Sequence, residues 1–114
     1  MREGGVIVVP MLQSDGTIKS RPVVILREMP PFGDLLVCGV STQLHQFAPD
    51  FDELIMRSDS DFATSGLMAE SVIRLGFLGV KSQKVIPGSI GVISPARHKR
   101  LLKKLSGYLI RNLK

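Results

Sequence analysis

Residues 21–26 read Arg-Pro-Val-Val-Ile-Leu, a cation and a proline at the head of a β-branched, apolar run. Such a run predicts a β-strand. A proline at the first position of a strand is tolerated because little of the hydrogen-bond ladder is lost there. The sequence therefore predicts a strand from Arg21 or Pro22 to Arg27, with a permanently charged guanidinium at its start.

A second apolar run, residues 35–40, ends at Ser41 and Thr42. If the two strands pair as a hairpin, the Arg21 guanidinium and the two hydroxyls meet at its open end. Arginine presents five donors in a rigid fork that suits phosphate oxygens. This combination predicts a place where a phosphate is held.

The rest of the chain predicts more short strands and one terminal helix. Strands are expected at residues 6–10, 52–56, 71–75 with an extension over 77–80, and 89–93. Gly76 and Gly79 predict a bulge or a tight bend. Turns are expected at residues 14–17 and 87–88, and a helical turn at residues 58–63 with Ser58 or Asp59 as its cap.

Ser94-Pro95 predicts the start of a helix, because serine is a good N-cap and proline suits the first helical position. One apolar face follows at helical spacing: Leu101, Leu102, Leu105, Tyr108, Leu109 and Leu113. Gly107 is expected to bend the helix or end it early. The whole pattern predicts a mainly β fold, a small and strongly bent barrel with a C-terminal helix packed on it.

The charge is unevenly distributed along the 114 residues, which are expected to form a single domain, residues 1–114. The formal net charge is +5, but residues 97–114 carry +7 and residues 1–96 carry −2. A basic C-terminal segment favours a polyanionic partner such as RNA, DNA or an acidic protein. The alternative is a solvated helix face. Asp50, Asp52 and Glu53 form an acidic cluster that is predicted to be a solvated loop.

The single cysteine, Cys38, cannot form an internal disulfide, and its apolar neighbours predict a core residue rather than a nucleophile. No apolar stretch approaches the ~20 residues of a membrane span, and the first residues lack the features of a secretory signal. We therefore expect a cytoplasmic protein that does not bind a membrane.

The ordered set of segments resembles the MazF/PemK family of bacterial toxins from type II toxin–antitoxin systems. Arg21-Pro22 and the apolar run after it are the most distinctive part. Residues 5–10, 40–43, 66–67, 71–74 and 90–94 resemble the other landmarks in order. The resemblance implies an SH3-like barrel, a homodimer and a cognate antitoxin protein. It also implies an endoribonuclease (an mRNA interferase) that cuts single-stranded RNA at a short sequence without a metal or another cofactor.

In the family, the arginine before the proline and the first hydroxyl residue after the third strand carry catalysis. The matching residues here are Arg21 and Ser41; the family more often has threonine at the second position, so Thr42 remains the alternative. Candidate RNA contacts are Gln43, His45 and Arg74. Many relatives have an acidic residue where this chain has Gly5.

Other interpretations of these residues stay open. Arg21 could pair with Asp15 or Asp34, Arg74 could form a surface ion pair, and the hydroxyls could serve a strand-ending turn. His45 is the nearest candidate general base, with an unperturbed pKa of about 6.5, or else a solvated loop residue. Two other functions remain: a gyrase-poisoning toxin of the same fold, and a non-catalytic relative that binds RNA or an antitoxin.

Overall fold

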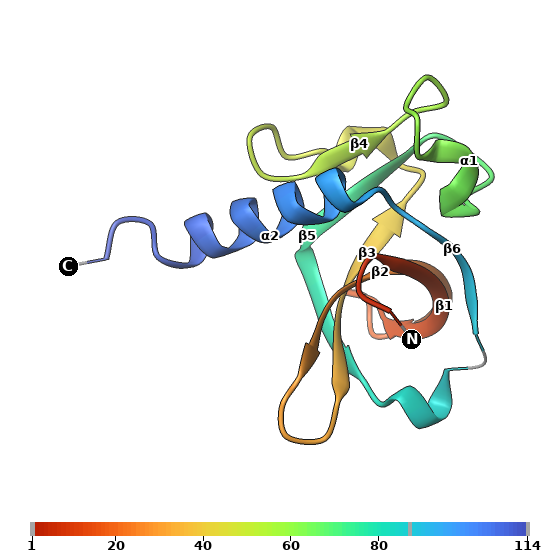
Figure 1. Cartoon of the computed structure of the whole chain (residues 1–114), viewed down its shortest axis with the longest axis vertical. Helices are drawn as coiled ribbons and strands as arrows, with labels where there is room; N and C mark the ends of the chain where they lie inside the picture. The colour runs from red at the N-terminus through yellow and green to blue at the C-terminus, as the bar shows by residue number, and fades with distance from the viewer. Residues whose placement is uncertain (1, 87, 114) are drawn as a thin grey trace.

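The computed structural model describes residues 2–86 and 88–113. Its six strands form one antiparallel sheet, in the order β4-β5-β3-β2-β1-β6, which curls into a half-barrel (Figure 1). The strands are β1 (Gly5–Leu12), β2 (Ile18–Met29), β3 (Asp34–Ser41), β4 (Glu53–Ile55), β5 (Ser71–Lys81) and β6 (Ser89–Val92). The helical segments are η1 (Leu44–Gln46), α1 (Phe62–Ser65), η2 (Gln83–Val85) and α2 (Pro95–Leu109). The predicted mainly β fold with a C-terminal helix is therefore confirmed.

Apolar side chains pack on both faces of the sheet, because successive residues of a strand point to opposite sides. One face packs against α2 through a cluster that includes Val24, Cys38, Ile73, Leu101 and Leu105. The other face carries a second cluster that includes Ile7, Val9, Val23, Val37 and, at its margin, Phe77. Cys38 is fully buried, as predicted, and burial raises the pKa of its thiol to about 12.

A bulge interrupts β5, as Gly76 predicted. Arg74 lies opposite Gly39 on β3, and Leu78 lies opposite the next residue, Cys38, so residues 75–77 have no partner between them. Four steps along β5 thus match a single step along β3, which reverses the alternation of side chains after the bulge. Gly79 pairs regularly with Val37, so the bend predicted there is wrong.

Strand β2 begins earlier than predicted, at Ile18, and Pro22 lies inside it rather than at its first position. Pro22 is opposite Val8 of β1, whereas the pairing of β2 with β3 starts only at Val23. Pro22 therefore lies in the part of β2 that pairs with β1 alone, where its missing N–H costs the sheet few hydrogen bonds.

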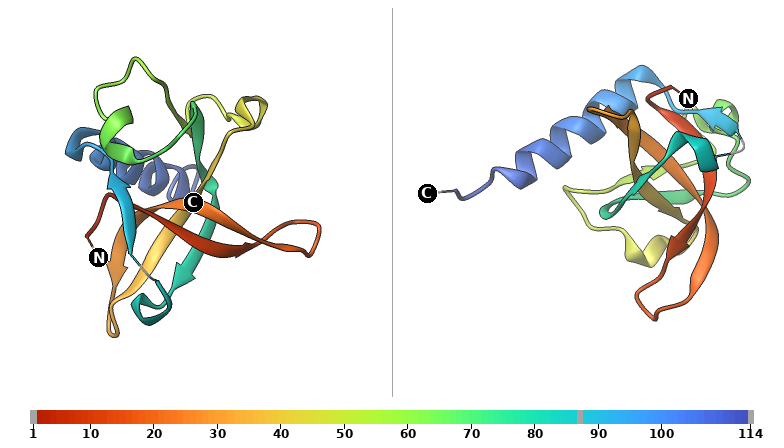
Figure 2. Two further views of the ribbon diagram at one scale, coloured as in Figure 1. Left: turned by 90° about the vertical axis from the view of Figure 1, so that its right-hand side faces the viewer. Right: turned by 90° about the horizontal axis from the view of Figure 1, so that it is seen from below.

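Helix α2 begins as predicted, with the Ser94 hydroxyl accepting a hydrogen bond from the backbone N–H of Arg97 at 3.1 Å. It continues through Gly107 but ends two residues later, at Leu109, so the helix does end before Leu113, the last residue of the predicted apolar face. The apolar face is only half used: Leu101 and Leu105 are buried, whereas Leu109 is 63% exposed and Leu113 is 73% exposed. The reason is that the C-terminal half of the helix projects beyond the sheet (Figure 2).

The helical turn predicted at residues 58–63 forms later, at Phe62–Ser65. Its N-cap residue is Asp61 rather than Ser58 or Asp59, and the Asp61 carboxylate is engaged elsewhere. Gly66 ends the turn at a φ of 75°, where a Cβ atom would lie 2.2 Å from the carbonyl oxygen of Ile90. The turn predicted at residues 87–88 includes Pro87, which lies outside the described residues. None of the described helices has the length and apolar character needed to cross a bilayer.

Candidate nucleic-acid interface

The strand register places Arg21, Gly39, Ser41 and Arg74 on one face of the sheet. Arg21 is two residues from Val23, which lies opposite Gly39; Gly39 in turn lies opposite Arg74. Ser41 is two residues beyond Gly39 on β3, so it shares that face. The guanidinium of β2 and the hydroxyl of β3 are therefore brought to the same side of the protein.

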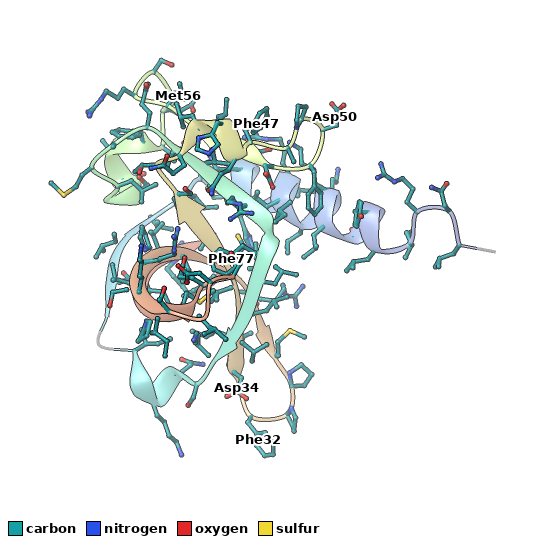
Figure 3. All side chains as sticks on the ribbon, turned by 180° about the vertical axis from the view of Figure 1, so that it is seen from behind. Phe32, Asp34, Phe47, Asp50, Met56 and Phe77 are labelled. Carbon is teal, nitrogen blue, oxygen red and sulfur yellow. The ribbon has the colours of Figure 1, made fainter. Side chains whose placement is uncertain are left out.

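The bulge adds Phe77 to this face, and two arginines lie over its ring. The Cζ atom of Arg21 is 5.6 Å from the ring centroid and that of Arg74 is 5.5 Å from it. Both distances fall within the range of a cation–π interaction. We call these three side chains the Phe77 surface. Figure 3 shows Phe77 near the centre of the molecule, whereas Phe32 and Asp34 lie at the distant tip of the β2–β3 hairpin.

Arg21 is held by a neutral partner rather than by a carboxylate. Its Nε donates a hydrogen bond to Oε1 of Gln13 at 3.0 Å, and Gln13 is held in turn because its Nε2 donates to the carbonyl oxygen of Met11. The expected partner Asp15 instead accepts hydrogen bonds from the backbone and hydroxyl of Thr17. The two terminal nitrogens of Arg21 make no hydrogen bond within residues 2–86 and 88–113, so both can donate to a ligand.

Neither arginine of the Phe77 surface is neutralised. Among the described residues, no carboxylate oxygen lies within 4.0 Å of the Arg21 or Arg74 guanidinium. The ion pairs considered for Arg21 with Asp15 or Asp34, and for Arg74 at the surface, are therefore absent from the part of the chain that the structure describes. Two unpaired cations on one ring form a positive surface suited to an anion.

Ser41 closes β3 and is 4% exposed. Its Oγ accepts a hydrogen bond from the backbone N–H of Gln43 at 3.0 Å, the strand-ending turn that the sequence left open. The hydroxyl keeps its own hydrogen, so it can still donate one hydrogen bond. Thr42 follows the strand and is exposed.

A pocket of about 590 Å³ lies where the β1–β2 hairpin, the end of β3 and the segment after α1 meet. Its polar and charged lining consists of Lys19, Ser20, Arg21, Ser41, Thr42, Gln43 and Ser71. Its apolar lining includes Leu67, Met68 and Ile90. None of the described residues in its wall is acidic or a histidine. We call this cavity the Arg21 pocket; Arg21 belongs both to its wall and to the Phe77 surface.

The three remaining predicted residues, the candidate RNA contacts, lie in three different places. Gln43 lines the Arg21 pocket, and Arg74 lies on Phe77. His45 is exposed in η1 and is not part of the pocket wall. In the other histidine, His98, the Nε2 atom is 2.7 Å from the carbonyl oxygen of Leu26, a residue of the core beside α2.

Of the acidic cluster, Asp50 is an exposed turn residue as predicted, but Asp52 and Glu53 are both buried, so the prediction is wrong for these two. Asp52 accepts hydrogen bonds from the backbone N–H groups of Ala48 and Leu75. Glu53 binds three cations of α2: Arg97 at 2.9 Å, Arg100 at 2.9 Å and Lys104 at 3.1 Å. The sequence did not reveal these ion pairs because Arg97 and Arg100 lie more than forty positions after Glu53 along the chain.

Arg97 is a structural residue rather than part of a basic surface, since it is only 4% exposed. Besides Glu53, its guanidinium contacts Asp61 at 2.8 Å and Asp59 at 3.1 Å. Burial alone would raise the pKa of Asp61, but hydrogen bonds from Arg97 and the backbone of Ser94 outweigh it and hold that pKa below its ordinary value. Burial likewise opposes a low pKa of Glu53, and hydrogen bonds from Arg100 and Lys104 lower it nonetheless.

Sequence reasoning missed three residues that build the interface: Phe77, Gly39 and Gln13. The glycines of β5 signalled the bulge, but not the side to which it turns Phe77. A scan against models of known protein families finds no match to this chain, and a search of curated proteins finds no significant match either.

Proposed function

We propose that this protein is a metal-independent endoribonuclease of the MazF/PemK type, built on an SH3-like barrel, that cuts single-stranded RNA. The observation that carries the proposal is the meeting of Arg21 and Ser41. The two residues come from different strands, share one face of the sheet and line one pocket that contains no described acidic residue. A guanidinium without a carboxylate partner beside a hydroxyl is the arrangement that the resemblance predicts for catalysis.

The reaction that suits these groups uses the RNA's own 2′-hydroxyl. Its oxygen attacks the adjacent phosphorus, the bond from phosphorus to the 5′-oxygen breaks, and the products end in a 2′,3′-cyclic phosphate and a 5′-hydroxyl. Negative charge grows on the non-bridging oxygens during the attack. The free terminal nitrogens of Arg21 would donate to those oxygens, and one such donor is worth about 3–4 kcal/mol of transition-state stabilisation.

Ser41 would donate its hydroxyl hydrogen to the phosphate or orient the 2′-hydroxyl. The described wall of the pocket contains no histidine and no carboxylate, so we assign the proton of the 2′-hydroxyl to solvent water, which also supplies the proton that the leaving 5′-oxygen takes up. His45, outside the wall, has no part in this scheme. A site of this kind works by electrostatic stabilisation and orientation rather than by general base catalysis.

Partners follow from the same proposal. The substrate is single-stranded RNA, the protein is a homodimer, and a cognate antitoxin neutralises it in the cytoplasm. Because Arg21 and Arg74 lack carboxylate partners in the described chain, an acidic antitoxin segment would find unpaired cations on the Phe77 surface.

The direct test is to incubate purified protein with a long single-stranded RNA in EDTA and to map the ends. The variants are Arg21→Ala, Ser41→Ala and Thr42→Ala. Arg111→Ala is the matched control, because Arg111 also lies over an aromatic ring, that of Tyr108 at 4.9 Å, but outside the wall of the Arg21 pocket. We expect discrete cuts with cyclic phosphate ends, retained in Arg111→Ala and lost in Arg21→Ala.

Intact RNA at high protein concentration would contradict the proposal. Growth arrest of cells that express the protein, and binding of RNA, would then separate the two rival functions. Growth arrest that survives Arg21→Ala would indicate the gyrase-poisoning toxin. Binding of RNA without any cut, and without growth arrest, would indicate the non-catalytic relative.

A further inference from the structure

We infer that Phe77 is the positioning residue of this interface: its ring holds the Arg21 and Arg74 guanidiniums together so that both face one RNA backbone. The inference rests on the proposed function and deepens it. Nothing in the resemblance assigns a role to Phe77, and the evidence for one is geometric.

The ring itself is firmly placed. The bulge at residues 75–77 turns Phe77 to the face of Arg74, and the ring then lies directly on the backbone of Gly39. A Cβ atom at Gly39 would come within 2.6 Å of Cδ2 of Phe77 and 3.2 Å of its Cε2. Glycine at this position of β3 is therefore what lets the ring approach so closely.

The two arginines have few other anchors. Arg74 makes no side-chain hydrogen bond to any described residue, and Arg21 makes one, through Nε to Gln13. The Phe77 ring is the contact that they share, at 5.5 Å and 5.6 Å. Without the ring, each guanidinium would sample many rotamers and would lose the orientation on which transition-state stabilisation depends.

The same geometry indicates the class of ligand. Two guanidiniums near one ring repel each other, and no described carboxylate offsets the repulsion. A phosphodiester strand that passes over the ring would offset it and would be gripped at more than one point. The outer planes of the guanidiniums would also offer bases a stacking surface.

The experiment compares four variants. Phe77→Leu removes the ring but keeps apolar bulk, Phe77→Tyr keeps the ring, and Gly39→Ala displaces it. Tyr108→Leu is the matched control, because it removes the ring beneath Arg111, away from the Arg21 pocket. The readouts are kcat and KM on a cleavable RNA oligonucleotide, and affinity by fluorescence anisotropy for the all-deoxy strand of that sequence, which lacks the attacking hydroxyl. All are measured well below each variant's Tm.

We expect Phe77→Leu and Gly39→Ala to lower kcat by about 10- to 100-fold, with a smaller change in KM, because misplacement of a catalytic group acts mainly on the transition state. Phe77→Tyr is expected to stay within about threefold of the unmodified protein. Tyr108→Leu is expected to lower Tm, because its ring packs on that of Phe51, without changing kcat.

Cleavage by Phe77→Leu at the unmodified rate would overturn the inference and leave the proposed function intact, as would an equal loss in Phe77→Tyr and Phe77→Leu. If the unmodified protein binds the deoxy strand but cuts no RNA, the proposed function fails. A loss of that binding in Phe77→Leu alone would then still support the positioning role. No binding and no cleavage by the unmodified protein would refute both.

Discussion

Two groups of arginines in this protein occupy opposite surroundings. Arg97 and Arg100 lie among Glu53, Asp59 and Asp61, which neutralise them across the joint between β4 and α2. Arg21 and Arg74 lie on an aromatic ring with no described carboxylate within reach. The residue type is the same, yet one pair stabilises the fold and the other remains free to bind an anion.

The difference shows why a charge count along the chain is a poor guide to a binding surface. Residues 97–114 hold the highest density of basic side chains, but three of them are used on Glu53 and its neighbours. Segment 1–96 has a net negative charge and nevertheless supplies both cations of the Phe77 surface. A cation without a carboxylate partner is available to an anion wherever it lies along the chain.

The largest effect is expected for Arg97→Met. Removing this buried cation leaves the carboxylates of Glu53 and Asp61 partly uncompensated, which costs about 3–5 kcal/mol of unfolding free energy. Urea denaturation measures it, with Arg27→Met as the control, because Arg27 pairs with Glu3 at the surface and such pairs contribute about 1 kcal/mol or less. An unfolding free energy unchanged in Arg97→Met would show that the network is not structural.

Next in size is the effect of removing the hydroxyl that we propose to be catalytic. Ser41→Ala should lower kcat for RNA cleavage by about 10²-fold, the cost of one lost donor to the developing charge, while the unfolding free energy changes little. Thr42→Ala should change kcat by less, since only Ser41 shares the face of Arg21 by register. The reverse order would assign the catalytic role to Thr42.

A smaller effect is expected in the pH dependence of the unfolding free energy, which involves the carboxylates around Arg97 and Arg100 but not the Phe77 surface. The folded-state pKa values of Glu53 and Asp61 are depressed below their ordinary values of 4.5 and 3.8. A depressed carboxylate stabilises the fold above its unfolded pKa, and this stability is lost as pH falls through the folded pKa. The unfolding free energy should therefore decline below about pH 4, and Arg100→Gln should make the decline shallower. A decline unaffected by Arg100→Gln would contradict the role of this pair.

Much of the fold was readable from local sequence patterns. The apolar runs placed the strands, and Ser94-Pro95 placed the start of α2 to the residue. The approach of Arg21 to Ser41 was predictable because it requires only that the neighbouring strands β2 and β3 pair.

The features that could not be predicted depend on contacts between distant segments, or on which face of the sheet a side chain points to after a bulge. Whether Phe77 points to one face or the other is decided by how many residues the bulge holds, and glycine spacing does not specify that number. The ion pairs of Arg97 join residues 36 to 44 positions apart. Neither relation leaves a periodic signal in the sequence.

The most direct test of the contrast between the paired arginines (Arg97 and Arg100) and the unpaired ones (Arg21 and Arg74) is the salt dependence of affinity for single-stranded RNA. Each phosphate contact contributes a slope of about −0.7 in the logarithm of the binding constant against that of salt concentration. We predict that Arg74→Gln makes the slope shallower by about that amount, while Arg100→Gln leaves it unchanged. A slope altered by Arg100→Gln and not by Arg74→Gln would contradict the account.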